Sequence, residues 1–438
     1  MTSDNRTLAA TQCARGISQA VRNQADAMAH INAAITADEN YCLAHLIKAW
    51  MLQGANDQQY SPQVAAETQL AKELLPEGNG VESGLLAALE PMQKGRRDKG
   101  VAMLAALCEQ HPTDAYLQLL AQEHAFWLGD ANRMRTVVET AAPHWTPTHA
   151  DYGPFLSLRS FANEEAGDYL AAERYGREAV EIDSSDVWGA HSVAHVLLMK
   201  GQIKQGIDWL DNLSVHWQNA NQMQHHLWWH YCLFLFETGE HDRIVELLHT
   251  KIRDPQSELI KAAPAATIDN NNYASLLMRL ELYGVDVSRL WQTLAEICAS
   301  RTANHASVFS NIHDMMVLTA TGQSEQANRL LASMAERFAN TTDTSSLACA
   351  YRQVGIPVCK AIKAHRQQNY NAVIELLGSI RHQLHYMGAS PAQRDVFFHL
   401  LVYAARKENR AELIRDYLAD IEQLGFCDVA NRAAYRLG

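Results

Sequence analysis

Apolar residues recur at three- and four-residue spacing along almost the whole chain, in segments separated by 22 glycines and 11 prolines. On an α-helix this spacing gathers apolar side chains onto one face, which can then pack against a neighbouring helix. The two-residue alternation of a half-buried strand is not evident between the turn signals. The pattern therefore predicts an all-α protein with almost no sheet.

A helical hairpin repeats along the chain. Gly167 and Gly201 each follow one apolar helical segment and precede another, and they stand 34 residues apart. This interval is the period of the tetratricopeptide repeat, a helix-turn-helix unit. The next such turn, at Gly239, follows 38 residues later, and fainter copies occur at Gly54, Gly129, Gly322 and Asn369. The irregular spacing predicts a tetratricopeptide-like superhelix of hairpins that forms a curved or closed solenoid.

A long connection is expected at residues 255–272, which contain Pro255, Pro264 and three consecutive asparagines. Proline and asparagine are typical of turns and loops. We therefore divide one continuous solenoid into an N-terminal half, residues 1–254, and a C-terminal half, residues 273–438.

Charge and cysteine usage narrow the class of protein. The formal charge is -12, and no basic stretch is longer than two residues, which disfavours nucleic acid and anionic membranes as partners. Eight widely spaced cysteines without a C-x-x-C motif resemble reduced core thiols. The first residues lack a signal-peptide pattern, and no apolar run approaches about 18 residues. We expect a cytoplasmic protein.

Histidines supply the candidate chemistry. When each turn glycine is numbered 15 within its repeat, six histidines fall at positions 2, 5, 6 or 9 of a first helix, on the predicted inner surface. They are His45, His191, His195, His226, His230 and His313. Trp229, at position 5, is placed to wall the same pocket. The alternative is that each histidine is a core residue satisfied by backbone or water.

Two histidine pairs in this set, His191 with His195 and His226 with His230, have the i,i+4 spacing that projects both rings in one direction. Together they offer four nitrogens to a divalent metal such as Zn²⁺. Neither pair forms an H-E-x-x-H motif, and four histidines would leave the metal closed rather than reactive. Acid–base chemistry by histidine needs no metal and stays open.

A second group of polar residues lies at the predicted start of a late helix, with Ser390 as its cap and Pro391 at its first position. Gln393, Arg394 and Asp395 fall in the first turn or so, where the helix N-terminus and a guanidinium favour an anionic ligand. A capping and salt-bridge cluster would explain the same residues.

These motifs together resemble the tetratricopeptide repeat protein 38 family. The resemblance runs from about His111 to Ala405 and includes the two histidine pairs, Phe309-Ser-Asn-Ile-His313, Val354-Gly355-Ile-Pro357 and Gly388-Ala-Ser390-Pro-Ala-Gln393-Arg394-Asp395. It implies a helical-repeat fold and marks the paired histidines, His313, Gln393, Arg394 and Asp395 as family features. Where the family pattern has an aspartate ahead of Ser275-Leu-Leu-Met-Arg279, this chain has asparagines, and Asp269 is the nearest substitute.

The leading hypothesis is a concave pocket lined by His, Asp and Arg that binds a small polar or anionic molecule or a peptide terminus. One alternative is an enzyme of the hydrolase or lyase type that uses the same residues by acid–base or metal-assisted chemistry, and another is a protein–protein scaffold. The catalytic candidates are His191, His195, His230 and Asp395. The ligand-binding candidates are His45, His226, Trp229, His313, Gln393 and Arg394.

Overall fold

The computed structural model describes residues 3–75, 80–429 and 432–435, and the chain divides into two compact units. Unit 1 comprises Met1–Val193 and Val215–Gln224, and unit 2 comprises Ala194–Ser214 and His225–Gly438. The division passes through a continuous helix, α11 (Val187–Met199). The other helices of unit 1 are α1 (Ser3–Val21), α2 (Ala27–Ala37), α3 (Cys42–Gly54), α4 (Ser61–Leu74), α5 (Gly80–Gln93), α6 (Arg97–Gln110), α7 (Ala115–Phe126), α8 (Ala131–Ala141), α9 (Tyr152–Glu165) and α10 (Tyr169–Ile182).

Unit 2 contains the remaining α-helices of the described chain. They are α12 (Ile203–Leu213), α13 (Met223–Thr238, in this unit from His225), α14 (His241–Leu247), α15 (Glu258–Ala262), α16 (Thr267–Leu282), α17 (Ala295–Ser300), α18 (Val308–Ala320), α19 (Ser324–Arg337), α20 (Ser346–Ala350), α21 (Ile356–Arg366), α22 (Tyr370–Ile380), α23 (Pro391–Lys407) and α24 (Ala411–Gln423).

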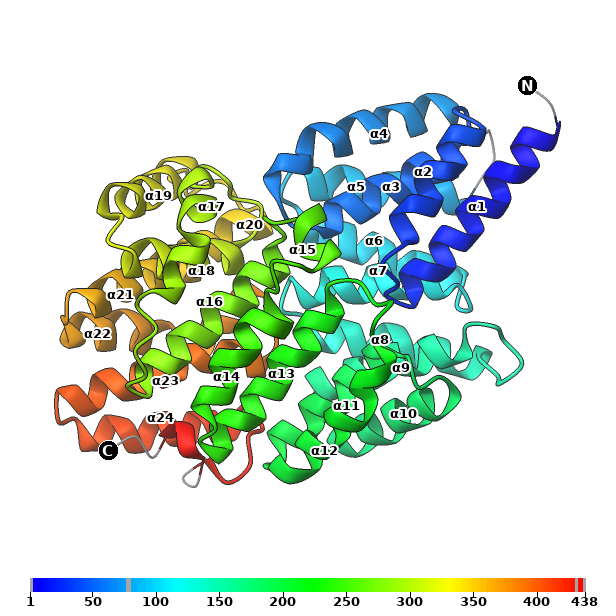
Figure 1. Cartoon of the computed structure of the whole chain (residues 1–438). Helices are drawn as coiled ribbons and strands as arrows, with labels where there is room; N and C mark the ends of the chain where they lie inside the picture. The colour runs from blue at the N-terminus through cyan, green and yellow to red at the C-terminus, as the bar shows by residue number, and fades with distance from the viewer. Residues whose placement is uncertain (1–2, 76–79, 430–431, 436–438) are drawn as a thin grey trace. The chain divides into compact units, whose positions relative to one another are not determined.

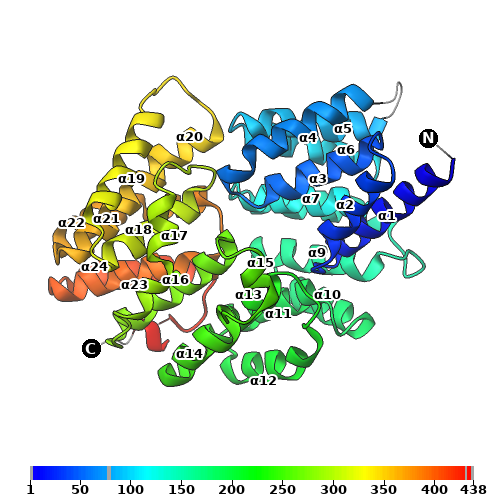
Figure 2. The same cartoon turned by 45° about the horizontal axis from the view of Figure 1, so that its top comes forward.

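Helices that follow one another in the sequence pack as pairs in both units. In unit 1, α1 packs on α2 and α9 on α10, and in unit 2, α21 packs on α22 and α23 on α24 (Figure 1). Figure 2 shows α21 beside both α18 and α22. The only bridge of strand type among the described residues is the isolated pair Gln24 and Ala220. The all-α prediction is confirmed, and the sequential pairing is consistent with a helical repeat.

Glycine turns separate the helices of several pairs. Gly167 has a φ of 84°, in the left-handed region that side chains other than glycine rarely occupy. This conformation lets Asp168 donate from its backbone nitrogen to the carbonyl of Asn163, which satisfies a helix-end acceptor. The Asp168 side chain then caps α10. A Gly-Asp dipeptide thus ends one helix and starts the next.

Gly201 and Gly239 have the same left-handed backbone as Gly167, with φ values of 66° and 77°, so the turns expected there are confirmed. The fainter turn at Gly54 has a different geometry. Gly54 is the last residue of α3, and Asn56, with a φ of 51°, takes the left-handed conformation instead.

The expected connection at residues 255–272 is partly helical, because α15 lies inside it and α16 begins at Thr267. The asparagines that suggested a loop are buried within α16, and each bonds to another part of unit 2. Asn270 accepts from Arg253, Asn271 donates to Ser310, and Asn272 pairs with His226. A polar residue can occupy a buried helix when a neighbouring element supplies its hydrogen bond.

The cysteines form no disulfide in the described chain, and six of the eight are buried. This is the arrangement expected of core thiols. No helix among the described residues is long and apolar enough to span a membrane.

Candidate functional site

The two histidine pairs lie on α11 and α13. His191 and His195 are one turn apart on α11, and His226 and His230 are one turn apart on α13, so each helix directs two rings to one side. All four residues are buried, with 5% or less of each exposed. A buried histidine ring normally needs partners for its two nitrogens.

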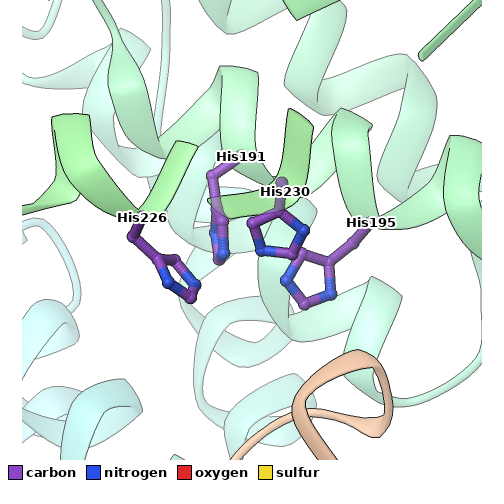
Figure 3. Close-up of side chains that lie close together, drawn as sticks. All are labelled: His191, His195, His226 and His230. Carbon is purple, nitrogen blue, oxygen red and sulfur yellow. The ribbon is translucent and has the colours of Figure 1, made fainter. Parts of the chain in front are cut away.

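The four rings are gathered together (Figure 3). Each of His191, His195, His226 and His230 offers a ring nitrogen, and these nitrogens all lie within 4.8 Å of one another. The rings of His195 and His230 have centroids 4.4 Å apart, which places α11 directly against α13. Together the four residues form a buried group that can hold a metal ion; we call it the histidine cluster.

Helix α16 supports the α13 side of the cluster. His226 donates from Nδ1 to Oδ1 of Asn272 across 2.9 Å, and Trp229 donates from its indole to the hydroxyl of Ser275 across 2.7 Å. The indole of Trp229 also stacks on the His226 ring, with centroids 5.1 Å apart and planes inclined by 8°. These contacts fix the orientation of the His226 ring.

Sequence reasoning named Asn272 and Ser275 but assigned them no role. Both are offset by 46 residues from their partners on α13, because the two contacts join the same pair of helices. This offset differs from the repeat intervals of 34 and 38 residues, so the sequence carried no signal for either contact. His225, outside the predicted set, bonds to Asp269 across 2.8 Å. Asp269 is therefore a histidine partner, although not of the cluster.

Burial sets the charge state of His226. It lowers the pKa of His226 to about 4, although the bond to Asn272 opposes the shift, and the charge of His195 lowers it slightly further. The ring is therefore neutral near pH 7. Since an amide oxygen only accepts, the hydrogen sits on Nδ1 and the lone pair on Nε2, the form that binds a metal.

The two other histidines of the predicted stripe have partners of their own. His45, in unit 1, lies 2.5 Å from a carboxylate oxygen of Glu67 and 2.9 Å from the carbonyl of Glu39. His313, in unit 2, donates from Nδ1 to the carbonyl of Phe309 across 2.8 Å. The structure thus brings four of the six histidines together as a group that could hold a metal ion.

The predicted helix start at Ser390 and Pro391 is confirmed. Ser390 and Gln393 form a reciprocal capping box, so the Gln393 side chain bonds to its own helix end. Arg394 donates to the backbone carbonyls of Gly388 and Ala389. The side chains of Gln393 and Arg394 therefore serve local structure, and their role in binding a ligand stays a prediction.

Asp395 lies in a buried ionic network. Its carboxylate accepts from the hydroxyl of Tyr435 and lies 3.2 Å from Arg432 and 3.0 Å from His399. Burial by itself would raise the pKa of Asp395, but the charge of Arg432 and the bond to His399 hold it well below its usual range. The group stays ionised and engaged, which suits a structural ion pair better than a proton carrier.

The fold and the cluster define the class as an all-α protein with a buried four-histidine group. No protein-family model matches the chain.

Proposed function

We propose that this protein binds one divalent transition metal ion, foremost Zn²⁺, through His191, His195, His226 and His230. The observation that supports the proposal is the approach of four buried ring nitrogens to within 4.8 Å of one another. Imidazole nitrogen is a preferred ligand of zinc and its neighbours in the first transition series.

The four ring nitrogens are close enough for the histidine cluster to close around one ion. Zinc binds histidine nitrogen at about 2.0–2.1 Å, so tetrahedral ligands stand about 3.3–3.4 Å apart. Rings whose nitrogens lie within 4.8 Å reach that spacing through small rotations. Neutral imidazoles such as that of His226 need not lose a proton first.

The cluster favours a metal over the other roles expected of these histidines. A general acid or base works best with a pKa near the operating pH, whereas burial lowers the pKa of His226, one of the four histidines, to about 4. A peptide-binding surface must be accessible, whereas these residues are almost fully enclosed. Four histidines complete a tetrahedral shell, so we assign the ion a structural or storage role rather than a catalytic one.

The sequential helix pairs support a tetratricopeptide-like solenoid as the scaffold of this site. Membership of the tetratricopeptide repeat protein 38 family forms part of the same proposal, and it rests on the motifs of the sequence.

Cobalt substitution tests the proposal. Untagged metal-free protein is titrated with Co²⁺, and the expected result is a set of visible absorption bands that saturate at one equivalent and disappear when Zn²⁺ is added. The double variant His195→Ala/His230→Ala should weaken metal binding by more than about 100-fold, since loss of outer-shell partners alone weakens it 10–100-fold.

The matched control is His216→Ala/His249→Ala, which removes two exposed histidines outside the cluster and should bind Co²⁺ as the unaltered protein does. Absence of saturable Co²⁺ and Zn²⁺ binding by the unaltered protein would exclude the proposal, whatever the stability of the variants. Equal affinity in a helical, cooperatively unfolding His195→Ala/His230→Ala protein would exclude it as well.

A further inference from the structure

Arg279 of α16 is a buried cation that forms no salt bridge with any described residue. Only 1% of the residue is exposed, and no carboxylate of a described residue forms a salt bridge with its guanidinium. It donates instead to two backbone carbonyls, those of Ser275 at 3.3 Å and Ala392 at 3.0 Å, and lies 5.4 Å from the ring centre of Trp229. Buried charges in proteins are normally paired or bound to a ligand.

The nearby carboxylate of Asp395 already has other partners. Its attraction raises the pKa of Arg279, but burial outweighs it and lowers that pKa to about 10. Asp395 itself contacts Arg432, Tyr435 and His399. The positive charge of Arg279 is thus only partly balanced from within unit 2.

Two neighbouring side chains have a polar atom without a hydrogen-bond partner among the described residues. One is the amide nitrogen of Asn272, whose oxygen accepts from His226. The other is Nε2 of His313, which carries the lone pair because Nδ1 donates to the carbonyl of Phe309. Both residues are buried, so Asn272 contributes an unsatisfied donor and His313 an unsatisfied acceptor beside Arg279.

These groups lie around one stretch of α16. Asn272, Ser275 and Arg279 share a face of the helix at i, i+3 and i+7, and the guanidinium reaches back to the carbonyl of Ser275. His313 belongs to α18, which packs against α16, and the positive charge of Arg279 contributes to lowering its pKa after burial. The three groups therefore lie on one face of α16 and on the helix that packs against it.

We propose that Arg279, Asn272 and His313 bind a small carboxylate that also carries a hydroxyl or ammonium group. The carboxylate accepts from the guanidinium of Arg279 and from the amide of Asn272, while the hydroxyl or ammonium group donates to Nε2 of His313. The site adjoins the proposed metal centre through the bond between His226 and Asn272, and it deepens the proposed function by naming a ligand class. None of its three binding groups is a proposed ligand of the metal.

Calorimetric titrations of metal-free protein with four probes test the site. L-lactate and L-alanine carry both required groups, acetate lacks the donor, and trialanine presents the same chemistry at a peptide terminus. We expect saturable binding of L-lactate or L-alanine and weaker binding of acetate. Because the three residues are as enclosed as the histidine cluster, we expect trialanine to bind more weakly than L-alanine, which identifies the free acid as the ligand. Binding of trialanine at least as tight as that of L-alanine would identify the peptide terminus instead.

Arg279→Met should weaken binding of the preferred probe by at least about tenfold, because hydrogen bonds to a charged group are lost. The matched control is Arg366→Met, since Arg366 also lies 5.4 Å from a tryptophan ring centre but is paired with Glu281. His313→Phe should reduce binding of the preferred probe to the acetate level and leave acetate itself unchanged. The ratio of the affinity for the preferred probe to that for acetate therefore separates loss of the contact to Nε2 from a general loss of fold, which would weaken both.

Absence of saturable binding of every probe to the unaltered protein would overturn the site, as would unchanged binding in a folded Arg279→Met protein. Binding that requires zinc and disappears in His195→Ala/His230→Ala would place the carboxylate on the metal, which overturns this site and retains the proposed function. Binding that persists in that variant, while cobalt binding is lost, supports the site independently of the metal.

Discussion

His226 donates from Nδ1 to the side-chain oxygen of Asn272 across 2.9 Å, and this bond leaves Nε2 as the ring nitrogen that carries the lone pair. A histidine held in this way presents Nε2 in a fixed direction, as metal-binding histidines commonly do. The asparagine lies 46 residues further along the chain, on α16.

Replacing Asn272 with alanine should therefore weaken zinc binding by about 10–100-fold, since the His226 ring loses its orienting partner. Competition with a chromophoric chelator measures the change. Asn270→Ala is the control, because Asn270 lies on the same helix but bonds to Arg253. Equal zinc affinity in the Asn272→Ala and unaltered proteins would show that this bond does not act on the metal.

Replacing Gly206 with alanine should destabilise the packing of α12 on α13. A methyl group at this position would meet the ring of Phe234 directly. Overpacking of this kind costs about 1–3 kcal/mol, whereas the intrinsic helix preference of alanine returns at most about 1 kcal/mol. We expect a lower midpoint of urea unfolding.

Gly167→Ala is the comparison. A methyl group there would meet no atom within 4 Å, but the alanine must adopt a left-handed φ, so any loss of stability comes from backbone strain rather than crowding. A Gly206→Ala protein as stable as the original would show that the Phe234 ring moves aside without loss.

Replacing Arg432 with methionine should strongly destabilise unit 2. Arg432 lies 2.8 Å from Glu237 and 3.2 Å from Asp395, and all three side chains are buried. Removing one partner of a buried ion pair costs about 3–5 kcal/mol, because the remaining charges stay buried without compensation. Chemical denaturation followed by circular dichroism measures this loss.

The comparison for Arg432→Met is Arg381→Met, which breaks a more exposed pair with Asp420. That change should cost no more than about 1 kcal/mol. Similar losses from the two substitutions would contradict the assignment of Arg432 as the central charge of the network.

Glu123 of α7 should make unit 1 less stable as the pH rises. Burial raises the pKa of this carboxyl to about 7, and the nearby charge of Arg97 only partly offsets the effect. A carboxyl whose folded pKa exceeds its unfolded value, about 4.3, contributes stability that is fully present below the unfolded pKa. That contribution is lost as the pH rises toward 7.

The Glu123 contribution should change by at most about 1.4 kcal/mol per pH unit within this window. Glu123→Gln cannot ionise, so its denaturation midpoint should fall less between pH 5 and pH 7.5 than that of the unaltered protein. Identical pH dependence in the two proteins would assign the effect to other groups.

The helices and their turns were predictable because they depend on neighbouring residues. Apolar spacing predicted the all-α fold, and Gly167 and Gly201 adopt the left-handed turns expected of them. The i,i+4 spacing also predicted that each histidine pair shares a helix face. The helical start of α16 was missed, because its asparagines are stabilised by side chains of distant segments.

The repeat frame placed six histidines on one stripe, but it did not specify which of them meet. The position of a residue within a hairpin fixes its helix face, whereas ring-to-ring distances depend on how the helices cross. His195 meets His230, while His45 bonds to Glu67. Only the packing of the helices decides whether a histidine joins the cluster or bonds to a residue elsewhere.

The sequence by itself determined the helices, their capped ends and the two pairs of adjacent histidines, because backbone hydrogen bonds and side-chain periodicity act over four or five residues. The tertiary structure decided that these pairs meet, that Asn272 orients His226 and that Arg279 is buried without a salt bridge to any residue the structure describes. Those contacts join residues far apart in the chain, such as Arg279 and Ala392, and they form only when whole helices pack.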